Sequence, residues 1–178
     1  AHYYYGRELW FAVNAGKLET TFLDTAIAEI KRALEILPTF YHARYDLGLI
    51  YKRKRNIPAA LDCFKKVLAQ EPLHINSTYE LGFLYSAALN KTDSGIILME
   101  RAINWGYDGD DGYLNLGIAW AIKGDLHKAL HYFLKGAEKF PSNPLYYLNI
   151  AQTYKNIGDE LNYQKYIKMY QQISQKKP

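Results

Sequence analysis

The stretch "YDLGLIYKRKRNIPAALDCFKKVLAQEP", Tyr45–Pro72, decides the fold. Its first part carries a small residue, Gly48, inside an apolar pattern, and its second part carries apolar residues at helical spacing up to Phe64. Between the two parts, Asn56 and Pro58 are typical of a helix start, since an Asn side chain caps the first turn and Pro needs no N–H donor there. The stretch therefore predicts two helices joined by a short turn.

The same framework returns along the chain at intervals of about 34 residues. The pair Leu47-Gly48 recurs as Leu81-Gly82, Leu116-Gly117 and Ile150-Ala151. The aromatic residues and the prolines of the framework keep the same phase, at Tyr51, Tyr85, Trp120 and Tyr154, and at Pro38, Pro72 and Pro141. Such phased repetition predicts a stack of similar helical hairpins, each of which buries its apolar face against its neighbours.

This pattern resembles the tetratricopeptide repeat (TPR), in which Leu-Gly-x2-Tyr is followed by Ala-x3-Phe and then Pro. The resemblance implies an all-α fold, a right-handed superhelical solenoid of about five hairpins. It departs from the family at Arg44, where an aromatic residue is usual, and in the third unit, where Gly95 stands at the Ala position. The small residue of each unit is expected at a close crossing between the first (A) and second (B) helix of the hairpin.

The whole chain, 1–178, is predicted to be one TPR array. Its approximate units are 1–40, 41–74, 75–109, 110–143 and 144–178. The first unit is atypical: with Gly6 as its small residue, about eight extra residues must precede Ala26, and we expect one added turn in each helix. The last unit is predicted to be a terminal cap, since Tyr163 and Tyr170 replace the small residues found earlier.

Composition narrows the function classes. The chain has 178 residues, a net charge of +4 and one cysteine, Cys63, so we expect neither an internal disulfide nor a multi-cysteine metal site. The mild charge does not call for nucleic acid. We expect no membrane insertion and no cofactor, and the cytoplasm is slightly favoured because no signal or membrane-spanning segment is visible. Since the chain begins at Ala1 rather than Met, it is read as a processed product or a piece of a longer protein.

The basic cluster "KRKR", Lys52–Arg55, has three interpretations. The favoured one places it at the end of a helix, where cations are stabilised by the helix dipole. A second gives Lys52 and Arg53 a role in holding an acidic partner segment, and a third is nuclear import or phosphate binding.

The TPR resemblance implies that the A helices line a groove that binds an extended peptide or a helix of a partner. The residues in the groove-facing register are His42, Tyr45, Asp46, Leu49, Lys52, Arg53, Asn76, Tyr79, Glu80, Phe83, Asp111, Leu114, Asn115, Ile118, Leu145, Leu148, Asn149, Gln152 and Asn156.

Within this set, Asn115 and Asn149 occupy the same register and resemble part of the asparagine ladder of O-GlcNAc transferase arrays. An amide both donates and accepts, so it can bind a peptide group of any sequence. The alternative is that any polar residue suits an exposed inner surface. Asp46 and Glu80 hold the equivalent places upstream and predict a locally acidic half. The clamp with which some TPR domains hold acidic chaperone tails is absent from the aligned positions.

Three other motifs are better explained by structure than by chemistry. "DGDDG", Asp108–Gly112, lacks the later ligands of a calcium loop, so Asp110 or Asp111 is expected to cap a helix. His127 and His131 are four apart but have no third ligand nearby, so no metal site is predicted. Cys63 has no histidine placed to activate it.

The sequence therefore predicts a non-catalytic scaffold for protein–protein interaction. The alternative is a regulatory or substrate-recruiting arm of a larger enzyme such as a glycosyltransferase. Partner identity and oligomeric state are not predicted.

Overall fold

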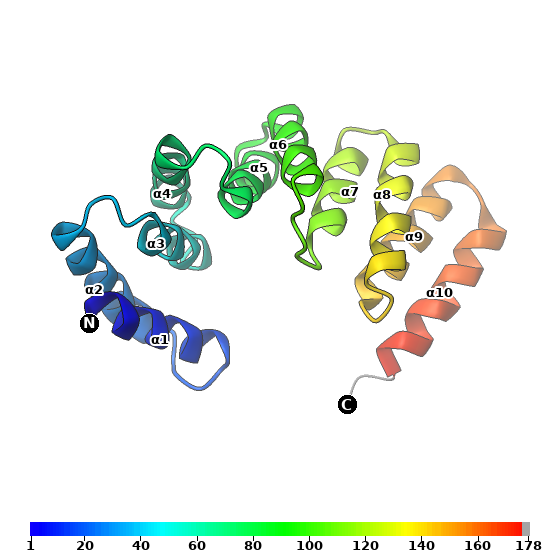
Figure 1. The fold of residues 1–178 in the computed structure, drawn as a ribbon. Coiled ribbons are helices and arrows are strands. Elements are labelled where there is room, and N and C mark those ends of the chain that lie inside the picture. The colour runs from blue at the N-terminus through cyan, green and yellow to red at the C-terminus, as the bar shows by residue number, and fades with distance from the viewer. Residues whose placement is uncertain (176–178) are drawn as a thin grey trace. The chain divides into compact units, whose positions relative to one another are not determined.

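The computed structural model describes residues 1–175, which form α-helices and short connections without a strand (Figure 1). The predicted all-α class is confirmed. The helices are α1 (His2–Asn14), α2 (Phe22–Ile36), α3 (Tyr41–Arg53), α4 (Ile57–Gln70), α5 (Ile75–Leu89), α6 (Thr92–Asn104), α7 (Gly112–Ile122), α8 (Leu126–Lys139), α9 (Pro144–Ile157) and α10 (Glu160–Gln175). The odd-numbered helices are the A helices of the predicted hairpins.

The chain divides into two compact units, unit 1 (Ala1–Leu81) and unit 2 (from Gly82 onward), and the boundary falls inside α5. Within each unit, consecutive helices pair as hairpins, α1 with α2 and α3 with α4 in unit 1, α7 with α8 and α9 with α10 in unit 2 (Figure 1). The division into five repeat units stays a prediction, and residues 176–178 of the last one lie outside the described residues.

Glycines allow the A and B helices to cross closely. A Cβ added at Gly48 would lie 2.6 Å from Cε1 of Phe64, and one added at Gly117 would lie 2.4 Å from Cε1 of Phe133. At Gly82 the nearest atoms include the backbone oxygen of Gly95, 2.9 Å away. The expected close crossings are confirmed, because any side chain at these places would collide with the facing helix.

The first hairpin follows the predicted register but not the predicted helix lengths. Gly6 lies at its close crossing, where an added Cβ would approach the backbone oxygen of Ala26 to 2.9 Å. However, α1 has 13 residues, as α3 has. The expectation of an added turn in each helix was wrong: the extra residues fall mainly in the connection, which spans residues 15–21 in the first hairpin and only 54–56 in the second. Polar residues in a surface connection avoid the burial that two longer helices would require.

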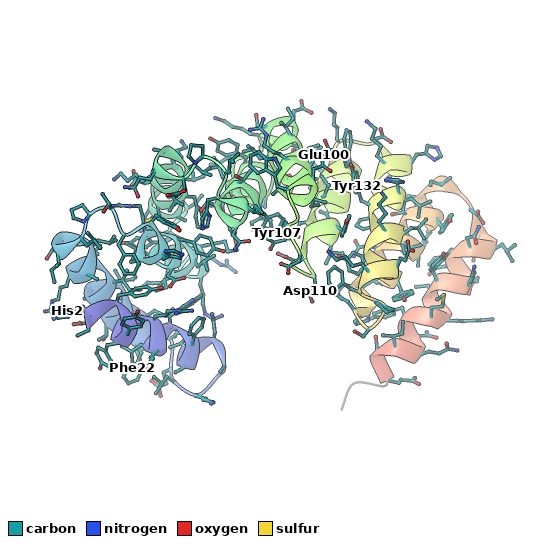
Figure 2. All side chains as sticks on the ribbon, in the orientation of Figure 1. His2, Phe22, Glu100, Tyr107, Asp110 and Tyr132 are labelled. Atoms are coloured by element: carbon teal, nitrogen blue, oxygen red, sulfur yellow. The ribbon has the colours of Figure 1, made fainter. Side chains whose placement is uncertain are left out.

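Unit 2 is held together partly by a polar cluster between three helices. The Glu100 carboxylate on α6 accepts a hydrogen bond from Trp120 Nε1 on α7 (3.3 Å) and one from the Tyr132 hydroxyl on α8 (2.9 Å), with Glu100 and Tyr132 labelled in Figure 2. Burial, followed by this bond to a carboxylate, raises the pKa of Tyr132. The cluster therefore joins α6, α7 and α8 through one half-buried carboxyl group.

The basic cluster Lys52–Arg55 lies at the end of a helix, as expected. Lys52 and Arg53 form the last turn of α3, and the connection continues through Lys54 and Arg55. Asn56 then caps α4 by accepting a hydrogen bond from the backbone N–H of Ala59 (3.3 Å). The prediction that this cluster ends a helix is confirmed.

Among the helices of residues 1–175, none has the length and apolar character that crossing a membrane requires.

Candidate functional site: the inner faces of the A helices

In unit 1, α1 and α3 are joined by a polar contact at the predicted groove residue Asp46. The Tyr3 hydroxyl on α1 donates to Oδ2 of Asp46 on α3 (2.9 Å), and Arg7 Nε lies 3.8 Å from the same oxygen. Burial raises the pKa of Asp46, and burial together with the Asp46 charge raises the pKa of Tyr3 to about 12. The predicted groove residue Asp46 therefore acts first as a link between two helices.

Lys52 and Glu80 form a second link inside unit 1. The Lys52 ammonium on α3 donates to both carboxylate oxygens of Glu80 on α5, at 2.7 Å and 2.5 Å. The Glu80 side chain is only 8% exposed, whereas that of Lys52 is 30% exposed. The expectation of a locally acidic half was wrong, since Asp46 and Glu80 both lie beneath cationic partners.

A histidine also contributes to the packing of unit 1. His74, just before α5, accepts a hydrogen bond at Nδ1 from the Ser77 backbone N–H (3.1 Å), which is the bond of a helix cap. The rings of Tyr41 and Tyr45 lie 5.8 Å and 5.2 Å from its ring. Burial, and then the proximity of His42, lowers the pKa of His74, so the neutral ring that can accept this bond is favoured.

Burial corrects part of the predicted groove. Tyr79 is fully buried and Leu114 is 8% exposed, so neither side chain offers surface to a ligand. Both stand three residues before the small residue of their unit. A side chain at this position lies at the edge of the helix surface that packs within the hairpin, so its exposure depends on the neighbouring side chains. Leu148, at the same register in α9, is 36% exposed.

In unit 2, Asp111 organises the entry to α7. Its carboxylate accepts hydrogen bonds from the Tyr107 hydroxyl (2.9 Å) and from Asn115 Nδ2 (3.2 Å). Asp111 is the N-cap residue of α7, but its side chain makes no capping bond. The expectation that Asp110 or Asp111 caps this helix is confirmed for the position of Asp111 but not for a capping bond, because the Asp111 carboxylate is engaged by Tyr107 and Asn115. The backbone oxygen of Asp110 accepts a hydrogen bond from the Tyr146 hydroxyl (2.7 Å).

The amides of α9 are arranged differently. Asn149 Nδ2 donates to the backbone oxygen of Leu145 (2.8 Å), and Gln152 Nε2 donates to Oδ1 of Asn156 (2.9 Å). Among the residues that the structure describes, these three side chains therefore bond only within their own helix. Leu145 and Leu148 stand beside them, 47% and 36% exposed. We call this row, Leu145, Leu148, Asn149, Gln152 and Asn156, the α9 amide surface.

The other predicted groove residues differ in exposure. His42, Arg53 and Asn76 are exposed, whereas Tyr45, Leu49, Phe83 and Ile118 are half-buried. The prediction omitted the inner face of α1, which carries Tyr3, Tyr4, Arg7, Trp10 and Phe11. Aligning Gly6 with Gly48 reveals these positions, since Arg7 is then equivalent to Leu49 in the repeat and Phe11 is equivalent to Arg53.

The structure contains little that resembles a reactive centre. Cys63 is buried, and burial raises the pKa of its thiol to about 11, so it is protonated at neutral pH. His127 and His131 are exposed on α8. Within residues 1–175 no three His, Cys, Asp or Glu side chains are grouped closely enough to hold a metal ion.

The fold is similar to that of several solved proteins, although no family model matches the sequence. The crystal structure of PilW, a type IV pilus biogenesis factor, superposes with a TM-score of 0.83 at 20% identity, over 97% of this chain and 77% of that one. The crystal structure of MamA gives 0.79 at 22% identity over 93% of both chains. YrrB, described as a TPR protein with an unusual peptide-binding site, gives 0.72 at 21% identity over 94% of this chain and 84% of that one.

By sequence, the chain is similar to the BBSome complex member BBS4 of Xenopus tropicalis, with 23% identity over 137 residues. The match covers 77% of this chain and 26% of BBS4, so the chain spans about a quarter of that relative's length. The resemblance to the tetratricopeptide repeat is thus confirmed at the level of the fold: the chain has an all-α, TPR-type fold of helical hairpins.

Proposed function

We propose that this chain is a non-catalytic protein-interaction module that binds an extended segment of a partner protein on the inner faces of its A helices. In unit 2 the binding surface is the α9 amide surface. The observation that carries the proposal is that three amide side chains, Asn149, Gln152 and Asn156, lie in one row and bond only within α9 among the described residues. Gln152 and Asn156 are exposed, and Asn149 is half-buried.

The spacing of these residues matches an extended ligand. Positions 145, 149, 152 and 156 follow steps of four, three and four, and position 148 lies three after 145 and four before 152, so all five share one face of the helix. An extended peptide presents one N–H and one C=O per residue, and an amide can bond to either. Because bonds within a helix surface are readily exchanged for bonds to a ligand, Asn149 and Gln152 can bind a partner backbone at little cost.

Two exposed leucines add the apolar part of the site. Leu145 and Leu148 flank the amides, and covering them removes apolar area from water at about 25 cal/mol per Å². Backbone recognition by amides and side-chain contact with leucines together favour a segment with apolar residues at some positions and little demand on the others. This combination supports a peptide rather than a small polar metabolite as the ligand.

The similarity to known proteins supports the same class of function. YrrB is described by its peptide-binding site, and BBS4 is named as a member of a complex. We extend only the general role to this chain, that of binding another protein. The burial of Cys63, whose thiol is protonated at neutral pH, supports a module without catalytic chemistry.

The test combines peptide selection with substitution of the amides. Peptides selected from a random display library on the immobilised chain are measured against the variant Asn149→Ala with Gln152→Ala, and we expect binding at least tenfold weaker. Gln164→Ala is the matched control, because Gln164 is an exposed amide on α10 that also bonds only within its helix. Unchanged affinity in the double variant, or an equal loss in Gln164→Ala, would contradict the assignment of this surface.

A further inference from the structure

We propose that the inner face of α1 and α3 in unit 1 binds an acidic segment of a partner protein. This inference rests on the proposed function, since it names the chemistry of a second stretch of the same type of surface. We call the surface formed by Tyr4, Arg7, Phe11, Leu49 and Arg53 the α1–α3 surface.

The charges of this face are arranged in depth. The carboxylates lie low: the side chains of Asp46 and Glu80 are 13% and 8% exposed. The cations lie higher: the Arg7 side chain is 43% exposed, and Arg53 is exposed. A carboxylate on an approaching ligand is therefore closer to the positive charges of Arg7 and Arg53 than to the carboxylates of Asp46 and Glu80. Its net interaction with this surface is attractive.

Arg7 has hydrogen-bonding capacity that the protein does not use. Its Nε is buried and has no hydrogen-bond partner in the part of the chain that the structure describes, since Asp46 is 3.8 Å away, beyond hydrogen-bond distance. The rest of the guanidinium is what a ligand can reach, because 43% of the side chain is exposed. The guanidinium lies 5.0 Å from the centre of the Phe11 ring, which holds its plane in place. A planar guanidinium held in this way matches the two oxygens of a carboxylate better than a lysine would.

Arg53 has no ion-pair partner among residues 1–175. Its guanidinium lies 6.0 Å from the Trp10 ring. A cavity of about 600 Å³ opens beside it, with Thr20 and Thr21 on its wall, and in that cavity Lys54 is already paired with Asp24. Arg53 is thus the cation left to bind an acidic side chain that enters the cavity.

Exposed aromatic rings make the ligand a peptide rather than a free anion. Phe11 is 50% exposed and Tyr4 is 64% exposed, and both stand on the inner face of α1 in the register set by Gly6. An acidic segment that also carries an apolar residue would pair with Arg7 and Arg53 and cover Phe11. Nucleic acid is the competing ligand, but its affinity grows with the number of phosphates neutralised, and the two arginines Arg7 and Arg53 neutralise few.

The experiment compares peptide selections on four forms of the full chain: wild type, Arg7→Gln with Arg53→Gln, Arg53→Gln alone, and Lys65→Gln. Lys65 is an exposed residue of α4 and forms no ion pair with a described residue, so Lys65→Gln controls for the loss of one positive charge. We expect peptides enriched in Asp and Glu from wild type and from Lys65→Gln. We expect the enrichment to vanish in the double variant, and the selected peptides to bind Arg53→Gln at least fivefold more weakly.

Several results would overturn the inference: selected peptides without acidic enrichment, enrichment that survives in the double variant, or binding of a single-stranded oligonucleotide in place of any acidic peptide. Circular dichroism melting establishes that each variant is folded, and Arg53→Gln remains informative if the loss of Arg7 disturbs Asp46. The variant Asn149→Ala with Gln152→Ala separates this inference from the proposed function. If acidic peptides still depend on Arg7 and Arg53 while the amide substitutions have no effect, the α9 amide surface fails and the α1–α3 surface stands. If the amide substitutions weaken binding while the arginine substitutions have no effect, the α1–α3 surface fails.

Discussion

In unit 1 the polar side chains of neighbouring A helices bond to one another, whereas in unit 2 the amides of α9 bond within their own helix. Tyr3 and Asp46 join α1 to α3, and Lys52 joins α3 to α5, each through a hydrogen bond to a carboxylate that is mostly buried. Asn149 shows the other arrangement, with its amide turned to the backbone of its own helix.

The difference shows what a repeat framework does and does not determine. Both units place small residues at the close crossings and large apolar residues around them, so both build the same hairpin. The inner positions of the A helices lie outside that requirement, so they are available either to brace adjacent helices or to face a ligand. In unit 1 the links between helices hold the carboxylates of Asp46 and Glu80 in mostly buried positions, while Arg7 and Arg53 are more exposed. In unit 2 the amides of α9 make no such link to another described helix, which leaves neutral amides at the surface.

The largest expected effect comes from filling a close crossing. Gly117→Leu should lower the free energy of unfolding by about 3 kcal/mol, because even a Cβ there lies 2.4 Å from Phe133 and the hairpin must open. Gly48→Leu should cost a similar amount in unit 1, where Phe64 blocks the same place. Urea unfolding followed by circular dichroism measures both.

These two variants also sharpen the comparison of the units. If each substitution shifts only part of the helical signal to lower urea, the units unfold separately, and if each shifts the whole signal they unfold together. Gly106→Ala is the control, since an added Cβ meets no atom within 4 Å there and only its φ of +100° opposes it, at a cost of about 1 kcal/mol. A loss in Gly117→Leu no larger than in Gly106→Ala would refute the tight crossing.

A smaller effect is expected from pH, and it should arise in unit 1. His74 caps α5 with a titratable ring, whereas in unit 2 α8 and α9 are capped by Asp125 and Asn143. The folded state lowers the pKa of His74 below its usual value near 6.5 through burial and through His42, while Glu71 opposes the shift. The unfolded chain therefore takes up the proton first, and stability that is complete above about pH 6.5 is lost as the pH falls through the folded pKa.

We expect a loss of about 1 kcal/mol between pH 7.5 and 5.5, the usual contribution of a helix cap. The rings of Tyr41 and Tyr45 also face His74. His74→Asn should remove most of the pH dependence, because an Asn side chain accepts the same bond without titrating. His131→Asn, on the exposed face of α8, should leave the pH profile of the melting temperature unchanged. Equal profiles for wild type and His74→Asn would rule out the mechanism.

The sequence was sufficient for the hairpins and their register, because glycine spacing and apolar periodicity are properties of the chain itself. It was sufficient even for the first hairpin, where Gly6 proved to be the crossing residue. It failed where the outcome depended on which side chains reach each other: Asp46 and Glu80 looked like an acidic surface until Tyr3, Arg7 and Lys52 were placed above them. Periodicity identifies the face on which a residue stands, but not the neighbour that covers it or pairs with it.

The smallest expected effect concerns the turns that join A and B helices. Arg55 in unit 1 and Gly124 in unit 2 both adopt a positive φ, 58° and 88°, between an A helix and the capping residue of the next B helix. A side chain in the left-handed region costs about 1–2 kcal/mol, whereas glycine avoids that cost but gains entropy when unfolded, by about 0.5–1 kcal/mol.

Exchanging the two residues separates this backbone effect from the charge of the basic cluster. Arg55→Gly should raise the free energy of unfolding by less than about 1 kcal/mol, and Gly124→Arg should lower it by a similar amount, since the same two terms act with opposite sign. Arg55→Gln, which removes the charge but keeps the side chain, is the matched control and should change stability by less than either. If Arg55→Gln instead raises the free energy of unfolding as much as Arg55→Gly does, charge repulsion within the basic cluster, rather than backbone strain, limits the stability of this turn. The turn of unit 1 would then differ from that of unit 2 by its charge alone.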